Sequence, residues 1–98
     1  PYLVTKDEIS DVNNLNMELD LNGERMQTGN TKTMIFNVDH IVSYVSRYMS
    51  LQPGDIITTG TPPGVGMGMK PQKFLKAGDE MRLSIELLGE QKSKVVAI

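Results

Sequence analysis

Apolar and polar side chains alternate in the first third of the chain, in the pattern of a strand with one buried face. Every second residue from 15 to 21 is apolar, and the residues between them are polar. Asn22 and Gly23 follow at once, and this pair readily adopts the positive φ angles of a type I′ turn. The pattern therefore predicts a hairpin of two strands at 15–21 and 24–28.

A spacing of three and four replaces the alternation between residues 38 and 49. Apolar residues at this spacing lie on one helix face, so we expect an amphipathic helix over 38–49 that packs its apolar side on a sheet. Asn37 is the expected N-cap, and Asp39 suits the positive end of the helix dipole. The sequence Gln-Pro-Gly-Asp at 52–55 ends the element with a turn.

Further strands are predicted in the second half of the chain. Residues 56–59 are all β-branched, and we expect a short strand with buried side chains there. Alternation returns at 81–87 after a turn at 76–79, and a reversal at 88–90 leads into a last strand through 95–98. Four or five strands with one helix predict a β-rich α+β fold.

Composition and charge narrow the class of protein. The 98 residues are 39% hydrophobic and 22% charged, which fits one small globular domain with one core. A net charge of -2 without charged blocks offers no electrostatic footprint for nucleic acid. Because the sequence has neither a signal-peptide pattern nor a long apolar span, we expect a cytoplasmic protein without membrane contact.

The reactive side chains are few. The chain has no cysteine and a single histidine, which excludes a thiolate nucleophile, a cysteine metal site and a histidine cluster within it. We expect His40 to be exposed in the first helical turn, without a catalytic partner. Asp7, Glu8 and Asp11 lack a turn that would make them converge on a metal, so we expect them to be solvated.

Glycine and proline are concentrated in residues 58–71. Glycines that cradle a phosphate open a helix, and no helical pattern follows this stretch, which argues against a nucleotide site. One remaining interpretation is a surface loop made of turns. The other is a ligand site, in which the threonines and backbone at 58–61 hold a carboxylate, Gly60 permits close approach and the prolines at 62–63 stiffen the exit.

Several motifs follow one another in the block at 27–71. They are Gly29-Asn30-Thr31, Met34-Ile35-Phe36, the helix at 41–49, residues 51–57 and the stretch from Thr59-Gly60-Thr61 to Gly66. In this order they resemble the C-terminal half of the fumarylacetoacetate hydrolase superfamily. Residues 1–9 also resemble the family segment that follows its Leu-Gly-Pro turn, so the resemblance covers nearly the whole chain. It implies that residues 1–98 are the C-terminal portion of a single catalytic domain with a mixed β-roll fold.

The resemblance also implies a homodimer in which Mg²⁺ or Mn²⁺ chelates a 2-oxo acid. The metal ligands, the lysine and the His/Glu pair that activates water lie upstream in the family, so no catalytic or metal-binding residue is assigned in this chain. We expect the chain to be inactive by itself and to associate with an N-terminal half. The resemblance places Thr61 against a substrate carboxylate or oxygen, with Gly60 and Thr59 shaping the approach.

Residues 64–91 resemble the bacterial branch that contains sugar-acid hydrolases and ureidoglycolate lyases. This favours hydrolysis of a C–C bond in a 2,4-diketo acid, of the acylpyruvate type or a diketo-deoxy sugar acid such as 2,4-diketo-3-deoxy-rhamnonate or -fuconate. An isomerase, hydratase, decarboxylase or ureidoglycolate lyase remains an alternative. From another class, so does a catalytically silent fragment or binding module that keeps the sheet and the glycine loop.

Overall fold

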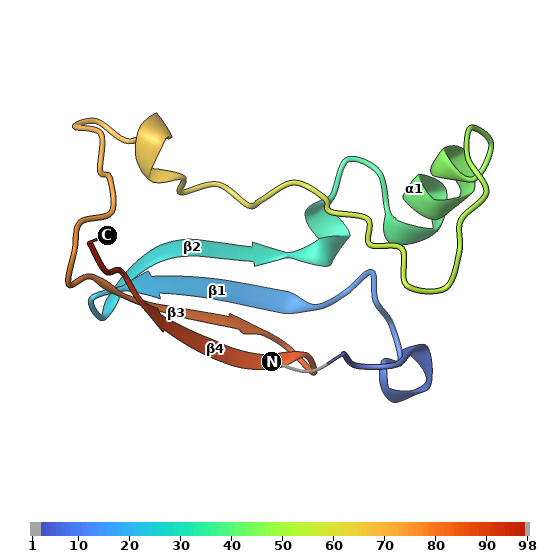
Figure 1. Ribbon diagram of the computed structural model, residues 1–98, viewed down its shortest axis with the longest axis horizontal. Helices are drawn as coiled ribbons and strands as arrows, with labels where there is room; N and C mark the ends of the chain where they lie inside the picture. The colour runs from blue at the N-terminus through green and yellow to red at the C-terminus, as the bar shows by residue number, and fades with distance from the viewer. Residues whose placement is uncertain (1–2, 98) are drawn as a thin grey trace.

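The fold is known from a computed structural model that describes residues 3–97. Its strands form one antiparallel sheet in the order β2-β1-β3-β4, and the chain between β2 and β3 loops away from the sheet (Figure 1). The expected β-rich α+β class is confirmed. The elements are β1 (Asn16–Leu21), β2 (Glu24–Asn30), α1 (Val38–Val45), β3 (Glu80–Ile85) and β4 (Gly89–Lys94), with 3₁₀ turns at Lys6–Glu8, Thr31–Thr33 and Gly66–Gly68.

The predicted hairpin is confirmed. β1 and β2 pair antiparallel, with Leu21 opposite Glu24. Asn22 and Gly23 have φ angles of +52° and +81°, as a type I′ turn requires. The second strand extends to Asn30, two residues beyond the predicted end, and remains paired with β1 up to that residue.

Both C-terminal strands differ from the sequence prediction. β3 ends at Ile85 rather than at residue 87, because Leu87 has a φ of +62° and belongs to the reversal into β4. β4 precedes the predicted strand at 95–98, of which residue 98 lies outside the described residues. Its residues are mostly polar and its position follows from pairing with β3, which hydrophobic alternation does not detect.

The helix is shorter than predicted. Asn37 caps it as expected, its Oδ1 accepting from the backbone N–H of His40 at 2.8 Å. α1 ends at Val45, not at residue 49, because the following N–H groups of Arg47 and Tyr48 donate to carbonyls three residues back. Such bonds tighten the last turn to 3₁₀ geometry.

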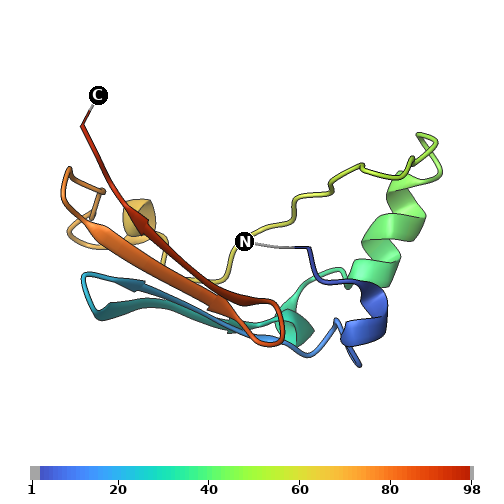
Figure 2. The same cartoon turned by 60° about the horizontal axis from the view of Figure 1, so that its bottom comes forward.

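The expectation that the helix packs on the sheet is wrong. α1 lies beyond the end of the sheet in both views (Figures 1 and 2), and Val42 and Tyr44 remain about half exposed. The helix start is held instead by the loop before β1. Asn13 accepts from the N–H of Val38 and donates to Asp39, at 3.2 and 3.0 Å.

The predicted buried strand at 56–59 is also wrong. The segment is extended but not hydrogen-bonded as a strand, and Ile56 is 87% exposed. An extended segment becomes a strand only when a neighbour satisfies its backbone groups, and the described residues place no such neighbour beside it. The turns expected at 52–55 and 76–79 are present, closed by Asp55 and Asp79.

The core is very small. Within residues 3–97 the buried hydrophobic side chains are Leu15 and Leu21, at the two ends of the predicted first strand. In the same range no helix is both long enough and apolar enough to cross a bilayer. The large apolar side chains left most exposed are Ile35, Leu3, Ile56, Tyr48, Val96 and Met67.

Candidate functional site

The predicted site residues lie in the extended segment that passes beside β2, the edge strand of the sheet (Figure 1). Thr59, Gly60 and Thr61 are all exposed. Of the three, the structure brings Thr61 into contact with the sheet, because its Oγ1 accepts a hydrogen bond from Nε2 of Gln27 at 2.9 Å. Apart from Gly60 and its two chain neighbours, no heavy atom of the described chain lies within 4 Å of the place where a Cβ on Gly60 would stand, so the backbone there is open to a ligand.

Glycines hold the loop close to β2. A Cβ added to Gly29 of β2 would lie 2.6 Å from Cβ of Pro62, which is closer than carbon atoms approach without a shift. Two residues further into the loop, Gly64 has a φ of +110° and packs directly on the backbone carbonyl of Met26. The loop and the strand can therefore touch only because neither has a side chain at these two points.

The rest of the glycine stretch is a packing element. Gly66 packs on the carbonyl of Lys73 and accepts from its N–H at 3.0 Å, and residues 66–68 make a single 3₁₀ turn. A phosphate cradle needs a longer helix whose N-terminus faces the anion, and none follows within the described residues. The elements that follow this stretch in the described range are the strands β3 and β4.

Gln27 is the residue that the sequence analysis missed. Its side chain on β2 donates from Nε2 to Oγ1 of Thr61 and, at 2.6 Å, to the carbonyl oxygen of Pro62. Gln27 belongs to the same sequence block as the Thr-Gly-Thr motif, but 34 residues separate it from Thr61. Strand alternation carries no information about such a contact.

Charged groups near the loop neutralise one another. Nζ of Lys73 lies 2.6 Å from Oε2 of Glu24, and this hydrogen bond holds the pKa of the Glu24 carboxyl below its usual value. No group of three or more His, Cys, Asp or Glu side chains converges among residues 3–97 in a way that would hold a metal ion. The site can offer a hydroxyl and backbone groups to a ligand.

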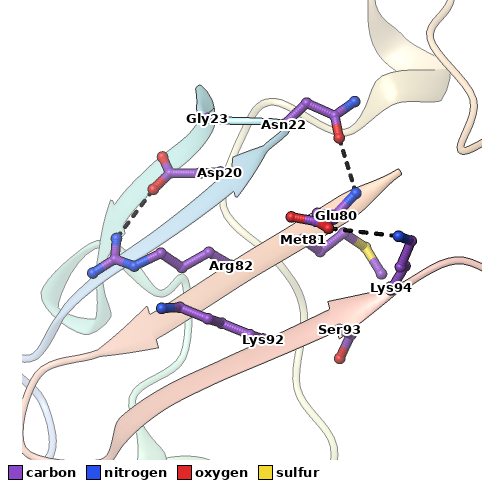
Figure 3. Close-up of a pocket in the computed structure, with 9 residues that line it drawn as sticks. All are labelled: Asp20, Asn22, Gly23, Glu80, Met81, Arg82, Lys92, Ser93 and Lys94. Carbon is purple, nitrogen blue, oxygen red and sulfur yellow. Dashed lines mark hydrogen bonds and ion pairs between the residues drawn. The ribbon is translucent and has the colours of Figure 1, made fainter. Parts of the chain in front are cut away.

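A hollow of about 470 Å³, which none of residues 59–61 lines, lies between the Asn22–Gly23 turn and strands β3 and β4 (Figure 3). Its acidic groups are already paired, with Arg82 at 3.1 Å from Asp20 and Lys94 at 3.8 Å from Glu80. The hydrogen bond from Arg25, more than any other contact, lowers the pKa of Asp20. Because these charges satisfy each other on a strand surface, the hollow is an ion-paired sheet face rather than an anion site.

His40 is exposed, as expected, and stacks between two aromatic rings. Its ring centroid is 4.9 Å from that of Phe36 and 6.3 Å from that of Tyr44. An imidazole that acts as a base needs a nucleophile or a water within hydrogen-bonding reach and usually an orienting carboxylate. Stacking on the helix surface supplies neither.

Comparison with known sequences gives a consistent result. Residues 1–96 match the family described as fumarylacetoacetate (FAA) hydrolase, C-terminal. The chain is 62% identical over 96 residues to a 2,4-didehydro-3-deoxy-L-rhamnonate hydrolase from Sphingomonas sp. (strain SKA58), and the alignment covers 97% of this chain and 34% of that protein. The chain therefore spans about a third of the length of this relative.

Solved structures agree with the sequence match. Fumarylacetoacetate hydrolase from the psychrophile Exiguobacterium antarcticum superposes with a TM-score of 0.92 at 45% identity, over 97% of this chain and 34% of that one. Maleylpyruvate hydrolase from Sphingobium sp. SYK-6, in complex with manganese(II) and pyruvate, gives a TM-score of 0.86 at 36% identity, over 96% and 33% of the two chains. The sheet, the helix and the loop thus share one arrangement with these enzymes.

The contact between Gly29 and Pro62 leads to a prediction about stability. Gly29→Ala should lower the free energy of unfolding by about 1–3 kcal/mol, the usual cost of overpacking, because Pro62 is a ring that cannot turn aside. Gly68→Ala is the matched control, since its Cβ would meet no atom within 4 Å. Urea unfolding of both variants measures the difference, and equal stability for the two would show that the loop does not press on β2.

Proposed function

Because this chain belongs to the fumarylacetoacetate hydrolase family, we propose that the complete polypeptide hydrolyses a C–C bond in a 2,4-diketo acid. The observation that carries this proposal is the 62% identity with a 2,4-didehydro-3-deoxy-L-rhamnonate hydrolase, whose name describes oxidised positions at C2 and C4 of a sugar acid. The substrate we favour is of this kind, a diketo-deoxy sugar acid. In this proposal residues 1–98 form the C-terminal portion of one catalytic domain.

Thr61 is the residue of this chain that we propose to contact the substrate. Thr61 is exposed beside an open stretch of backbone at Gly60, and Thr59 borders the same opening. Pro62 follows immediately and is packed against Gly29, so the hydroxyl projects from a restrained segment. A restrained donor of this kind serves to orient a substrate, since small displacements of a positioned group cost rate.

The proposal includes a divalent metal, Mg²⁺ or Mn²⁺, whose ligands lie outside this chain. The described residues do not fit a metal centre, because no three acidic or imidazole side chains converge among them. Support comes from the maleylpyruvate hydrolase solved with manganese and pyruvate, whose chain this one covers to 33%. We therefore propose that the ligands come from parts of the polypeptide outside residues 1–98, and that this chain alone is inactive.

The exposed apolar surface supports association with further protein. Two buried hydrophobic side chains in the described range are too few for a stable core, and side chains such as Ile35 and Ile56 are almost fully exposed. We propose that an N-terminal half of the domain covers part of this surface and that the complete protein forms a cytoplasmic homodimer. The relative from Sphingomonas is about three times as long as this chain, so a complete protein of that length would have further residues to pack on this surface.

The activity is tested with protein expressed from the complete gene. Hydrolysis of a 2,4-diketo acid between C3 and C4 releases pyruvate, so 2,4-didehydro-3-deoxy-L-rhamnonate with Mn²⁺ or Mg²⁺ should yield one pyruvate for each substrate consumed. Removal of metal with EDTA should abolish the release, and added Mn²⁺ should restore it. Consumption of the diketo acid without release of pyruvate would favour an isomerase, hydratase or decarboxylase. Release of glyoxylate from ureidoglycolate would favour a lyase. Binding without turnover would indicate a binding module.

The role of Thr61 is tested in the same assay. Thr61→Val keeps the shape of the side chain and removes its hydroxyl, so kcat/KM should fall about 10- to 100-fold, the equivalent of one hydrogen bond to a charged group. Thr28→Val is the control, because Thr28 is an exposed threonine on β2 and undergoes the same change. If Thr61→Val retains the kcat/KM of the control, Thr61 does not contact the substrate.

A further inference from the structure

The amide of Gln27 joins β2 to the loop at the point where Thr61 leaves the sheet. We propose that Gln27 is a positioning residue that orients the hydroxyl of Thr61 as a hydrogen-bond donor to a carboxylate or carbonyl oxygen of the ligand. The inference rests on the proposed function, because it needs Thr61 to face the substrate. It adds a residue and a direction of hydrogen bonding that the proposed function does not contain.

The orientation of the amide follows from its second partner. A glutamine side chain can be turned end for end, which exchanges its donor and acceptor groups. Here the same end lies 2.6 Å from the carbonyl oxygen of Pro62, and a carbonyl oxygen can only accept. That end must therefore be the NH₂ group, and the bond to Thr61, at 2.9 Å, runs from Gln27 to the hydroxyl oxygen.

The direction of this bond determines what Thr61 can still do. A threonine hydroxyl has one hydrogen to donate and lone pairs that accept. Because Oγ1 accepts from Gln27, its own hydrogen is directed elsewhere, and none of the side-chain hydrogen bonds among residues 3–97 uses it. The hydroxyl of the exposed Thr61 thus keeps its hydrogen for a ligand, where a carboxylate or carbonyl oxygen can accept it.

The surrounding contacts make this arrangement rigid. Gly29 and Met26 lie on either side of Gln27 along β2, and both touch the loop, at Pro62 and Gly64. Gln27 itself is partly buried, and its two donors bridge consecutive residues of the loop. These contacts hold the Gln27 amide and the loop in one relative position. The hydrogen bond from Gln27 to Thr61 therefore keeps one direction.

Binding of pyruvate in the presence of Mn²⁺ tests the proposal without depending on turnover. With protein from the complete gene, isothermal titration should show that Gln27→Glu raises the Kd for pyruvate at least about tenfold, because a carboxylate accepts the hydroxyl hydrogen and repels the acid. Gln27→Met keeps the length without the donors and should raise the Kd by a smaller factor. Gln91→Glu is the matched control, since Gln91 on edge strand β4 also donates to a hydroxyl, that of Ser93.

A double-mutant cycle with Thr61→Val separates positioning from a purely structural role. When the hydroxyl is absent there is nothing to orient, so Gln27→Met should change the pyruvate Kd by less than about twofold in that background. Equal weakening in both backgrounds would overturn the proposal, as would Gln27 variants that bind like the Gln91 control, or a protein that does not bind pyruvate. Pyruvate binding with this pattern but no diketo-acid hydrolysis would refute the proposed reaction alone.

Discussion

The close approach of the loop at 61–66 to the edge strand β2 is the contact on which the candidate site depends. It requires glycine on both sides, at Gly29 in the strand and at Gly64 in the loop, because a side chain at either position would strike backbone or ring atoms. With the backbones in contact, the amide of Gln27 reaches two consecutive loop residues. The contacts of β2 with Thr61, Pro62 and Gly64 restrain the loop at three neighbouring points and so hold Thr61 in place.

The same chain leaves most of its apolar side chains uncovered. A sheet with charged residues paired across one surface and few buried side chains stabilises itself poorly, since surface ion pairs contribute little. The exposed isoleucines before the Thr-Gly-Thr motif are best understood as surface that further protein covers. On this account β2 holds the chain from Thr61 onward, and protein outside the chain would cover the exposed segment before it and close a pocket around Thr61.

Much of the fold can be predicted from the local pattern of apolar, polar and turn residues, whereas the contacts of the site cannot. The hairpin and the cap at Asn37 were predictable because they depend on neighbouring residues: a type I′ turn at Asn22–Gly23 and a side-chain bond three residues away. The strand at 56–59 failed because β-branched residues favour a strand only where a partner exists. β4 was misplaced because its pairing with β3, not its own polar sequence, defines it. The residue pattern indicated a possible ligand site at 58–61, and the family resemblance singled out Thr61 within it. Neither the pattern nor the resemblance indicated Gln27.

The central claim is that Thr61 donates a hydrogen bond to the acid group of a bound 2-oxo acid. A crystal structure of the complete protein with pyruvate and Mn²⁺ tests it most directly. The account predicts a pyruvate oxygen about 2.5–3.0 Å from Oγ1 of Thr61, the usual range for an O–H···O bond, with the amide of Gln27 still donating to the same hydroxyl. Pyruvate bound in the protein without contact to residues 59–61 would contradict the account.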